Sequence, residues 1–115
     1  MLFRSDAVMA VNLKSVFLAC HAAIPEMVRG GGGSIISLSS VLGMTGGAPH
    51  FTTHAYAASK AGIIGLTRAM AAHYAPQHIR VNCLSPGLID TPMSTRARAS
   101  AEVMEIGRAS CRERV

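Results

Sequence analysis

A tyrosine and a lysine lie four residues apart in the segment Tyr56-Ala57-Ala58-Ser59-Lys60. On a helix, residues at this spacing share one face, so the ammonium group can approach the phenol. A free tyrosine has a pKa of about 10, and half-ionising it near pH 7 takes about 4 kcal/mol. A cation about 4 Å away supplies roughly that energy at an effective dielectric constant near 20. The pair can therefore do proton chemistry in a half-buried cleft, although an ordinary helix with a surface lysine shows the same spacing.

Two hydroxyl residues precede this pair. Residues 34–39 are short, apolar and β-branched, which predicts a buried strand that ends at Ser39 and Ser40. Residues 41–55 are rich in glycine and contain a proline, so we expect a loop that leads into a helix beginning near Tyr56 and stopping before Pro76. Open α/β sheets bind ligands at the carboxyl ends of their strands, and the serines, Tyr56 and Lys60 are predicted to converge there.

The remaining elements complete one crossover. Ser5 or Asp6 can cap a helix that carries apolar residues at helical spacing, has Pro25 as a candidate kink and ends near Arg29. The glycine run 30–33 follows a helix and precedes a strand, the reverse of the order in a phosphate-binding loop, so we interpret it as a linker. Residues 79–84 predict a second apolar strand, ended by Pro86-Gly87.

The order helix, strand, helix, strand predicts an α/β fold with parallel strands. Two parallel strands need cover on both faces and neighbours on both edges. We therefore expect part of a larger doubly wound parallel sheet.

Composition limits the other possibilities. The chain has 115 residues, half of them apolar, which allows at most one small domain. We expect neither a membrane span nor a secretory signal, and hence a cytoplasmic protein. The three cysteines are odd in number and lack CxxC spacing, so neither a disulfide framework nor a zinc site is predicted.

The formal net charge is +5, and residues 106–115 contribute +2 of it. Residues 106–115, IGRASCRERV, match the translation of a common sequencing-library adapter, and we interpret them as a non-native tail. Without them, eight basic residues face five acidic ones, and no aromatic residues are interleaved with a basic stripe. Nucleic-acid binding is therefore not expected.

Five segments together resemble the short-chain dehydrogenase/reductase family, whose fold is Rossmann-like. They are VNLKSVF at 11–17, GSIISLSS at 33–40, YAASKAG at 56–62, IRVNCLSPG at 79–87 and LIDTPM at 88–93. The resemblance implies an oxidoreductase that transfers a hydride between NAD or NADP and an alcohol or ketone. It also implies a homodimer or homotetramer and no nucleic-acid or membrane partner.

The resemblance gives each matched residue an expected role. Tyr56 would be the general acid/base, and Lys60 would favour the ionised phenol and bind the nicotinamide ribose. Ser40 would hold the substrate oxygen, and Asn12 would position a water in a proton relay to Lys60. The cofactor-binding residues implied are Tyr56, Lys60, Pro86, Gly87, Ile89 and Thr91.

The sequence departs from the family in the loop before the tyrosine. Ser40 and Tyr56 are sixteen residues apart, three more than is usual in the family. We expect the added residues between Gly46 and His54, where His50, Phe51, Thr52 and His54 would shape substrate specificity, unless the histidines simply lie at the surface. No metal site is predicted, because the two histidines lack an HExxH pattern and a nearby carboxylate.

The second departure is that the family's glycine-rich TGxxxGxG turn is not found in these 115 residues. That turn brings the backbone close to the cofactor pyrophosphate at a helix N-terminus. Residues 1–105 are therefore expected to be a partial NAD(P)-binding domain without its N-terminal cofactor-binding half, inactive in isolation. The alternative function is a catalytically inert module that associates through its two long helices, residues 6–29 and 56–75, which resemble the family's dimer-forming pair.

Overall fold

The first long helix runs without a break from Ser5 to Arg29. The computed structural model describes residues 5–45 and 54–92. The chain divides into two compact units, Met1–Ser85 and Pro86–Val115. The helix consists of α1 (Ser5–Met9), the π-helical turn η2 (Ala10–Lys14) and α2 (Ser15–Arg29). It continues through Pro25, the residue that the sequence marked as a candidate kink, and its irregular turn comes earlier, at η2.

One expectation about this helix needs correction. By length and composition alone, Ser5–Arg29 could cross a membrane, with a mean hydropathy of 1.6 over its best 18-residue window. No such segment was expected from the sequence, where only an uninterrupted apolar run was counted as a candidate span. Length and composition do not decide the matter, because an apolar helix of a globular domain passes the same test.

The glycine run connects this helix to the sheet. Gly31 and Gly32 have φ angles of 89° and 147°, a region that glycine adopts readily. A Cβ on Gly32 would lie 2.8 Å from the backbone oxygen of His78, so the linker also needs a residue without a side chain. The predicted linker is thus confirmed.

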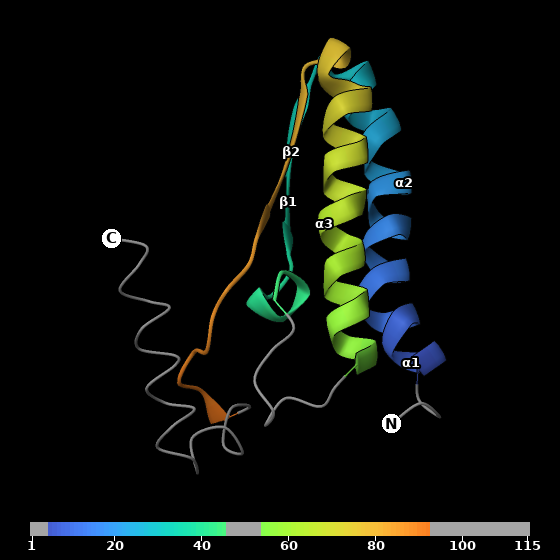
Figure 1. The fold of residues 1–115 in the computed structure, drawn as a ribbon. Coiled ribbons are helices and arrows are strands. Elements are labelled where there is room, and N and C mark those ends of the chain that lie inside the picture. The colour runs from blue at the N-terminus through green and yellow to red at the C-terminus, as the bar shows by residue number, and fades with distance from the viewer. Residues whose placement is uncertain (1–4, 46–53, 93–115) are drawn as a thin grey trace, which may run out of the picture. The chain divides into compact units, whose positions relative to one another are not determined.

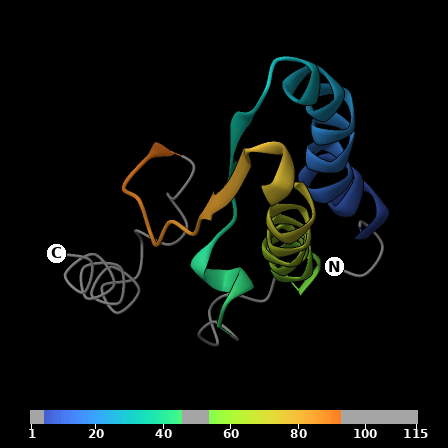
Figure 2. The same cartoon turned by 90° about the horizontal axis from the view of Figure 1, so that it is seen from above.

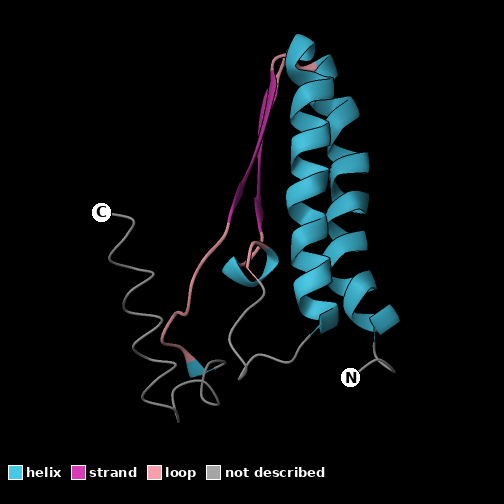
Figure 3. Ribbon diagram, in the orientation of Figure 1, coloured by secondary structure: helices cyan, strands magenta, loops and turns pink. Residues whose placement is uncertain are grey.

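The two strands are β1 (Gly33–Leu38) and β2 (Ile79–Leu84), and they pair in parallel, as predicted. Their residues pair one to one, from Gly33 opposite Ile79 to Leu38 opposite Leu84. The pairing extends by one hydrogen bond of 2.7 Å, from the backbone N–H of Ser39 to the oxygen of Leu84. Figure 3 shows the strands lying beside the helices.

Between the strands, the chain forms the 3₁₀ turn η3 (Val41–Gly43), helix α3 (His54–Tyr74) and the 3₁₀ turn η4 (Ala75–Gln77). Helix α3 begins at His54, two residues before the predicted start, so His54 belongs to the helix and not to the loop. Of the other residues expected to shape specificity, His50, Phe51 and Thr52 lie outside the described residues.

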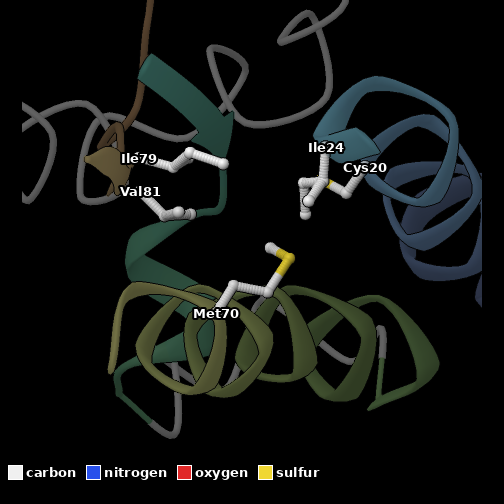
Figure 4. Close-up of a cluster of buried hydrophobic side chains, with 5 residues drawn as sticks. All are labelled: Cys20, Ile24, Met70, Ile79 and Val81. Atoms are coloured by element: carbon white, nitrogen blue, oxygen red, sulfur yellow. The ribbon is translucent and has the colours of Figure 1, made fainter. Parts of the chain in front are cut away.

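Helices α2 and α3 lie side by side on the same face of the sheet (Figure 1, Figure 2). Side chains from both helices and from β2 point toward one another between these layers (Figure 4). The buried cluster consists of Cys20, Ile24, Met70, Ile79 and Val81. This core fixes α3 against the strands, and α3 carries the tyrosine and lysine.

The opposite face of the sheet is uncovered within the described part of the first unit. Ile36 is 65% exposed, and Leu38 and Leu84 on the same face are exposed as well. Alternate residues of a strand point to opposite faces, and β1 carries isoleucine or leucine on both of them, which is typical of a sheet with helices on each side, while β2 has Arg80 and Asn82 beside Leu84 on its exposed face. The observed α/β fold with parallel strands confirms the expected fold class.

Candidate active site

Lys60 is fixed to the end of β1 at both its side chain and its backbone. Its Nζ donates a hydrogen bond of 3.0 Å to the backbone oxygen of Leu38, the last residue of the strand. The buried hydroxyl of Ser39 donates one of 2.7 Å to the backbone oxygen of Lys60. The second turn of α3 is therefore held against the carboxyl end of β1, where the sequence predicts the site.

The same lysine lies near the tyrosine. Lys60 Nζ is 5.6 Å from the centre of the Tyr56 ring. Both residues are half-buried on α3, one helical turn apart. An ammonium group at this range is attracted by the face of the ring. Since Leu38 accepts only one of the three ammonium protons, two donors remain for a ligand.

Ser40 is buried, lies two residues after the end of β1 and caps η3. Its Oγ accepts a hydrogen bond of 3.2 Å from the backbone N–H of Leu42. Because this bond uses a lone pair of the hydroxyl, the Ser40 proton can still be donated to another oxygen. The turn packs closely on α3, since a Cβ on Gly43 would lie 2.7 Å from the backbone N of Ala61.

Asn12 reaches the site through a second serine. Its Nδ2 donates a hydrogen bond of 3.2 Å to Ser59 Oγ, and the Ser59 hydroxyl donates one of 2.7 Å to the backbone oxygen of Tyr56. Asn12 lies in the π-helical turn η2, while Ser59 is fully buried on α3. The four predicted catalytic residues thus belong to one connected region of the first unit, linked through Ser39, Ser59 and the end of β1.

Ser39 and Ser59 were not assigned a function from the sequence. A signal for Ser59 was present: it shares a helix face with Ile63, Thr67 and Met70, all buried. A hydroxyl on the buried face of a helix needs a hydrogen-bond partner, which the sequence alone does not identify.

The predicted cofactor-binding residues Pro86, Gly87, Ile89 and Thr91 belong to the second unit. They follow β2 in the chain, and Ile89 is exposed while the other three are partly buried. Their role in binding a cofactor stays a prediction. Within the ranges that the structure describes, no cluster of three or more histidine, cysteine or acidic residues could hold a metal ion.

A hollow of about 550 Å³ is formed by the two long helices. Its lining includes none of the four predicted catalytic residues and consists of Asp6, Met9, Ala10, Leu13, Lys14, Phe17, Gly62 and Leu66. The hollow is mostly apolar, whereas the candidate site offers hydroxyl, ammonium and amide groups.

Comparison with known proteins identifies the family of the chain. The family model described as short chain dehydrogenase matches residues 4–102. The chain is 44% identical over 103 residues to the 3-oxoacyl-(acyl-carrier-protein) reductase FabG of Thermotoga maritima, a match over 90% of this chain and 41% of that protein. The chain thus spans about two fifths of the length of this relative.

Solved structures show the same relationship. The TT0495 protein from Thermus thermophilus superposes with a TM-score of 0.83 and 34% identity, over 92% of this chain and 44% of that one. A gluconate 5-dehydrogenase from Burkholderia cenocepacia, solved in complex with NADP and tartrate, gives a TM-score of 0.81 and 31% identity. That match covers 92% of this chain and 40% of the dehydrogenase. With the family match over residues 4–102, these likenesses show that the chain belongs to the short-chain dehydrogenase/reductase family, whose members are oxidoreductases.

Proposed function

We propose that this chain supplies the acid–base part of an oxidoreductase that interconverts an alcohol and a ketone with NAD or NADP. The observation that carries the proposal is the arrangement at Lys60: two hydrogen bonds fix it to the end of β1 beside Ser40, and its ammonium group lies 5.6 Å from the Tyr56 ring centre. The proposal is that acid, cation and hydroxyl donor act together here, at the strand ends where α/β sheets bind ligands.

The proposed roles follow from the groups in place. Tyr56 exchanges a proton between its hydroxyl and the substrate oxygen. Ser40 donates its hydroxyl proton to the same oxygen, because its capping bond leaves that proton available. Lys60 stabilises the negative charge on the Tyr56 oxygen, and Asn12 positions a water in a proton relay to Lys60.

The groups present fit a nicotinamide cofactor. Lys60 keeps two ammonium donors after its bond to Leu38, and ribose hydroxyls accept such bonds. When bound, the cofactor supplies or accepts the hydride. Pro86, Gly87, Ile89 and Thr91 are proposed to orient the nicotinamide, while Tyr56 and Lys60 contact the ribose. The relative solved with NADP supports NAD or NADP as the cofactor, and a cytoplasmic location belongs to the same proposal.

The test is NAD(P)H turnover by the full-length protein against a panel of ketones and alcohols. Tyr56→Phe removes only the phenolic oxygen and is expected to abolish most of the turnover. Tyr74→Phe is the matched control, because Tyr74 is the other tyrosine of the chain and lies at the far end of the same helix. The proposal fails if the wild-type protein turns over none of the panel, or if both variants behave alike.

We propose further that residues 1–105 form part of a longer NAD(P)-binding domain. The uncovered sheet face and the match to 41% of the Thermotoga reductase support this. The coding sequence upstream should then encode the glycine-rich turn in the same frame, and the isolated chain should show no turnover. Residues 106–115 are proposed to be adapter-derived, which the nucleotide sequence of that region would contradict if it differed from the adapter.

A second candidate function is association through the long helices. Val11 is 70% exposed, and Phe17 and Leu18 are each 53% exposed, an unusual number of large apolar side chains on one helix. Together with the apolar hollow, they support a homodimer or homotetramer built on this surface. Light scattering should show a mass above that of the monomer, which Phe17→Glu lowers. Flotation of the chain with lipid vesicles would instead support a membrane role for Ser5–Arg29.

A further inference from the structure

The π-helical turn η2 and helix α3 approach each other closely at two neighbouring positions. A Cβ on Gly62 would lie 2.7 Å from Cδ2 of Leu13, so the missing side chain at Gly62 is what lets Leu13 pack there. One turn earlier on α3, the same approach brings Asn12 within hydrogen-bond distance of Ser59. The contact between η2 and α3 therefore has an apolar part and a polar part next to each other.

The polar part contains one fully buried hydroxyl with two defined bonds. Ser59 donates its only proton to the backbone oxygen of Tyr56, 2.7 Å away, and its oxygen accepts a hydrogen bond of 3.2 Å from Asn12 Nδ2. Because the Ser59 proton is used, Asn12 can bond to Ser59 only through its NH₂ group. The Ser59 hydroxyl thereby fixes which way the Asn12 amide faces, and it also ties that amide to the backbone of Tyr56.

We propose that Ser59 is a positioning residue of the candidate active site, an inference that rests on the proposed function. Its hydroxyl joins the Asn12 side chain to the first turn of α3, so that Asn12 and Tyr56 keep one relative arrangement. It touches neither substrate nor cofactor, and it acts through the two residues to which it is bonded.

The chain offers a matched control on the same helix. Thr67 is buried two turns after Ser59, and its Oγ1 has no hydrogen-bond partner within the described residues. Thr67→Val therefore removes a buried hydroxyl from α3 without removing a bond to the site. A difference between Ser59→Ala and Thr67→Val reports the hydrogen bonds of Ser59 and not the general cost of changing a buried polar group.

The experiment is a double-mutant cycle on kcat and KM in the full-length protein, with Ser59→Ala, Asn12→Ala and the double variant. Ser59→Ala is expected to lower kcat about tenfold, the size of one to two hydrogen bonds, with little change in KM. Asn12→Ala is expected to lower kcat in the wild-type background and to have little further effect after Ser59→Ala, because both changes break the same link. Thr67→Val should leave kcat unchanged.

The outcomes separate the positioning role from the proposed function. Two results with an active wild type would overturn the positioning role alone. In the first, Ser59→Ala has the same kcat as Thr67→Val. In the second, the effects of Ser59→Ala and Asn12→Ala on kcat are additive. A wild type without turnover would overturn the proposed function and this inference with it. If Ser59→Ala does not fold by circular dichroism, Ser59→Cys replaces it, because a thiol keeps the size of the side chain and weakens both bonds.

Discussion

Replacing Lys60 by methionine tests the electrostatic reasoning most directly. The substitution keeps an unbranched side chain of similar length but removes the ammonium group near Tyr56. If that charge stabilises the phenolate of Tyr56, its loss should slow proton transfer. A substitution that left the rate intact would show that the spacing of the pair has no catalytic meaning.

The distance sets the order of magnitude of the effect. A unit negative charge placed at the Tyr56 ring centre, 5.6 Å from Lys60 Nζ, would interact with the ammonium group by about 3 kcal/mol at an effective dielectric constant near 20, and the phenolate charge lies mainly on the oxygen bonded to that ring. Each 1.36 kcal/mol is a factor of ten in rate, so Lys60→Met should lower kcat/KM by about 100-fold. Lys60→Arg keeps the charge but not the compact ammonium geometry, and an intermediate loss is expected.

The assay is NAD(P)H turnover by the full-length protein with its best substrate, alongside thermal unfolding of each variant. Lys14→Met is the control, since Lys14 is the other lysine of the chain and is exposed on the first long helix. Unfolding data are needed because Lys60 also bonds to the Leu38 oxygen. The reasoning is refuted if folded Lys60→Met retains the activity of Lys14→Met.

Three further predictions concern stability and reactivity. Burial raises the pKa of the Cys20 thiol, so alkylation should label Cys20 more slowly than partly exposed Cys83. The labelling rate of Cys20, followed by mass spectrometry, should rise only above the usual pH range of a thiol. Equal rates for the two cysteines would contradict this. Gly43→Ala should lower the melting temperature, because the Cβ of the new alanine would meet the backbone of α3. At Gly65 a Cβ would have open space, so Gly65→Ala should raise the free energy of unfolding by about 1 kcal/mol in chemical denaturation. Met70→Ala should cost about 2 to 5 kcal/mol of unfolding free energy by the same measurement, and a loss below about 1 kcal/mol would show that the core at Met70 collapses around the missing side chain.

The sequence predicted the elements well where local chemistry decides them. The second strand was expected at residues 79–84 and is found there, because β-branched residues are bounded by a helix stop and by Pro86-Gly87. The start of α3 was placed two residues late, because the prediction was set at Tyr56 and did not use Thr53, a residue type that often caps helices, directly before His54. Such a boundary depends on packing against η3, which local propensity does not record.

The residues of the candidate site could be proposed from the sequence, but their hydrogen-bond connections could not. Tyr56, Lys60 and Ser40 were identified from spacing and from the resemblance to the family. Their links run through Ser39, Ser59 and a main-chain oxygen of β1. The bonds of Ser39 to Lys60, of Lys60 to Leu38 and of Asn12 to Ser59 join residues far apart in the chain. A backbone carbonyl has no signature in a sequence, and a buried serine does not show which partner it will find.

The two bonds between Lys60 and the end of β1 bypass the segment that connects Thr45 to His54. Because these bonds fix Lys60 relative to β1 directly, the number of residues in that segment need not alter the acid–base geometry. The sequence predicts the three extra residues in that segment, and the bonds of Lys60 to β1 do not depend on its length. Insertions and deletions between the serine and the tyrosine are then a route by which substrate range can evolve while the proton-transfer chemistry is retained.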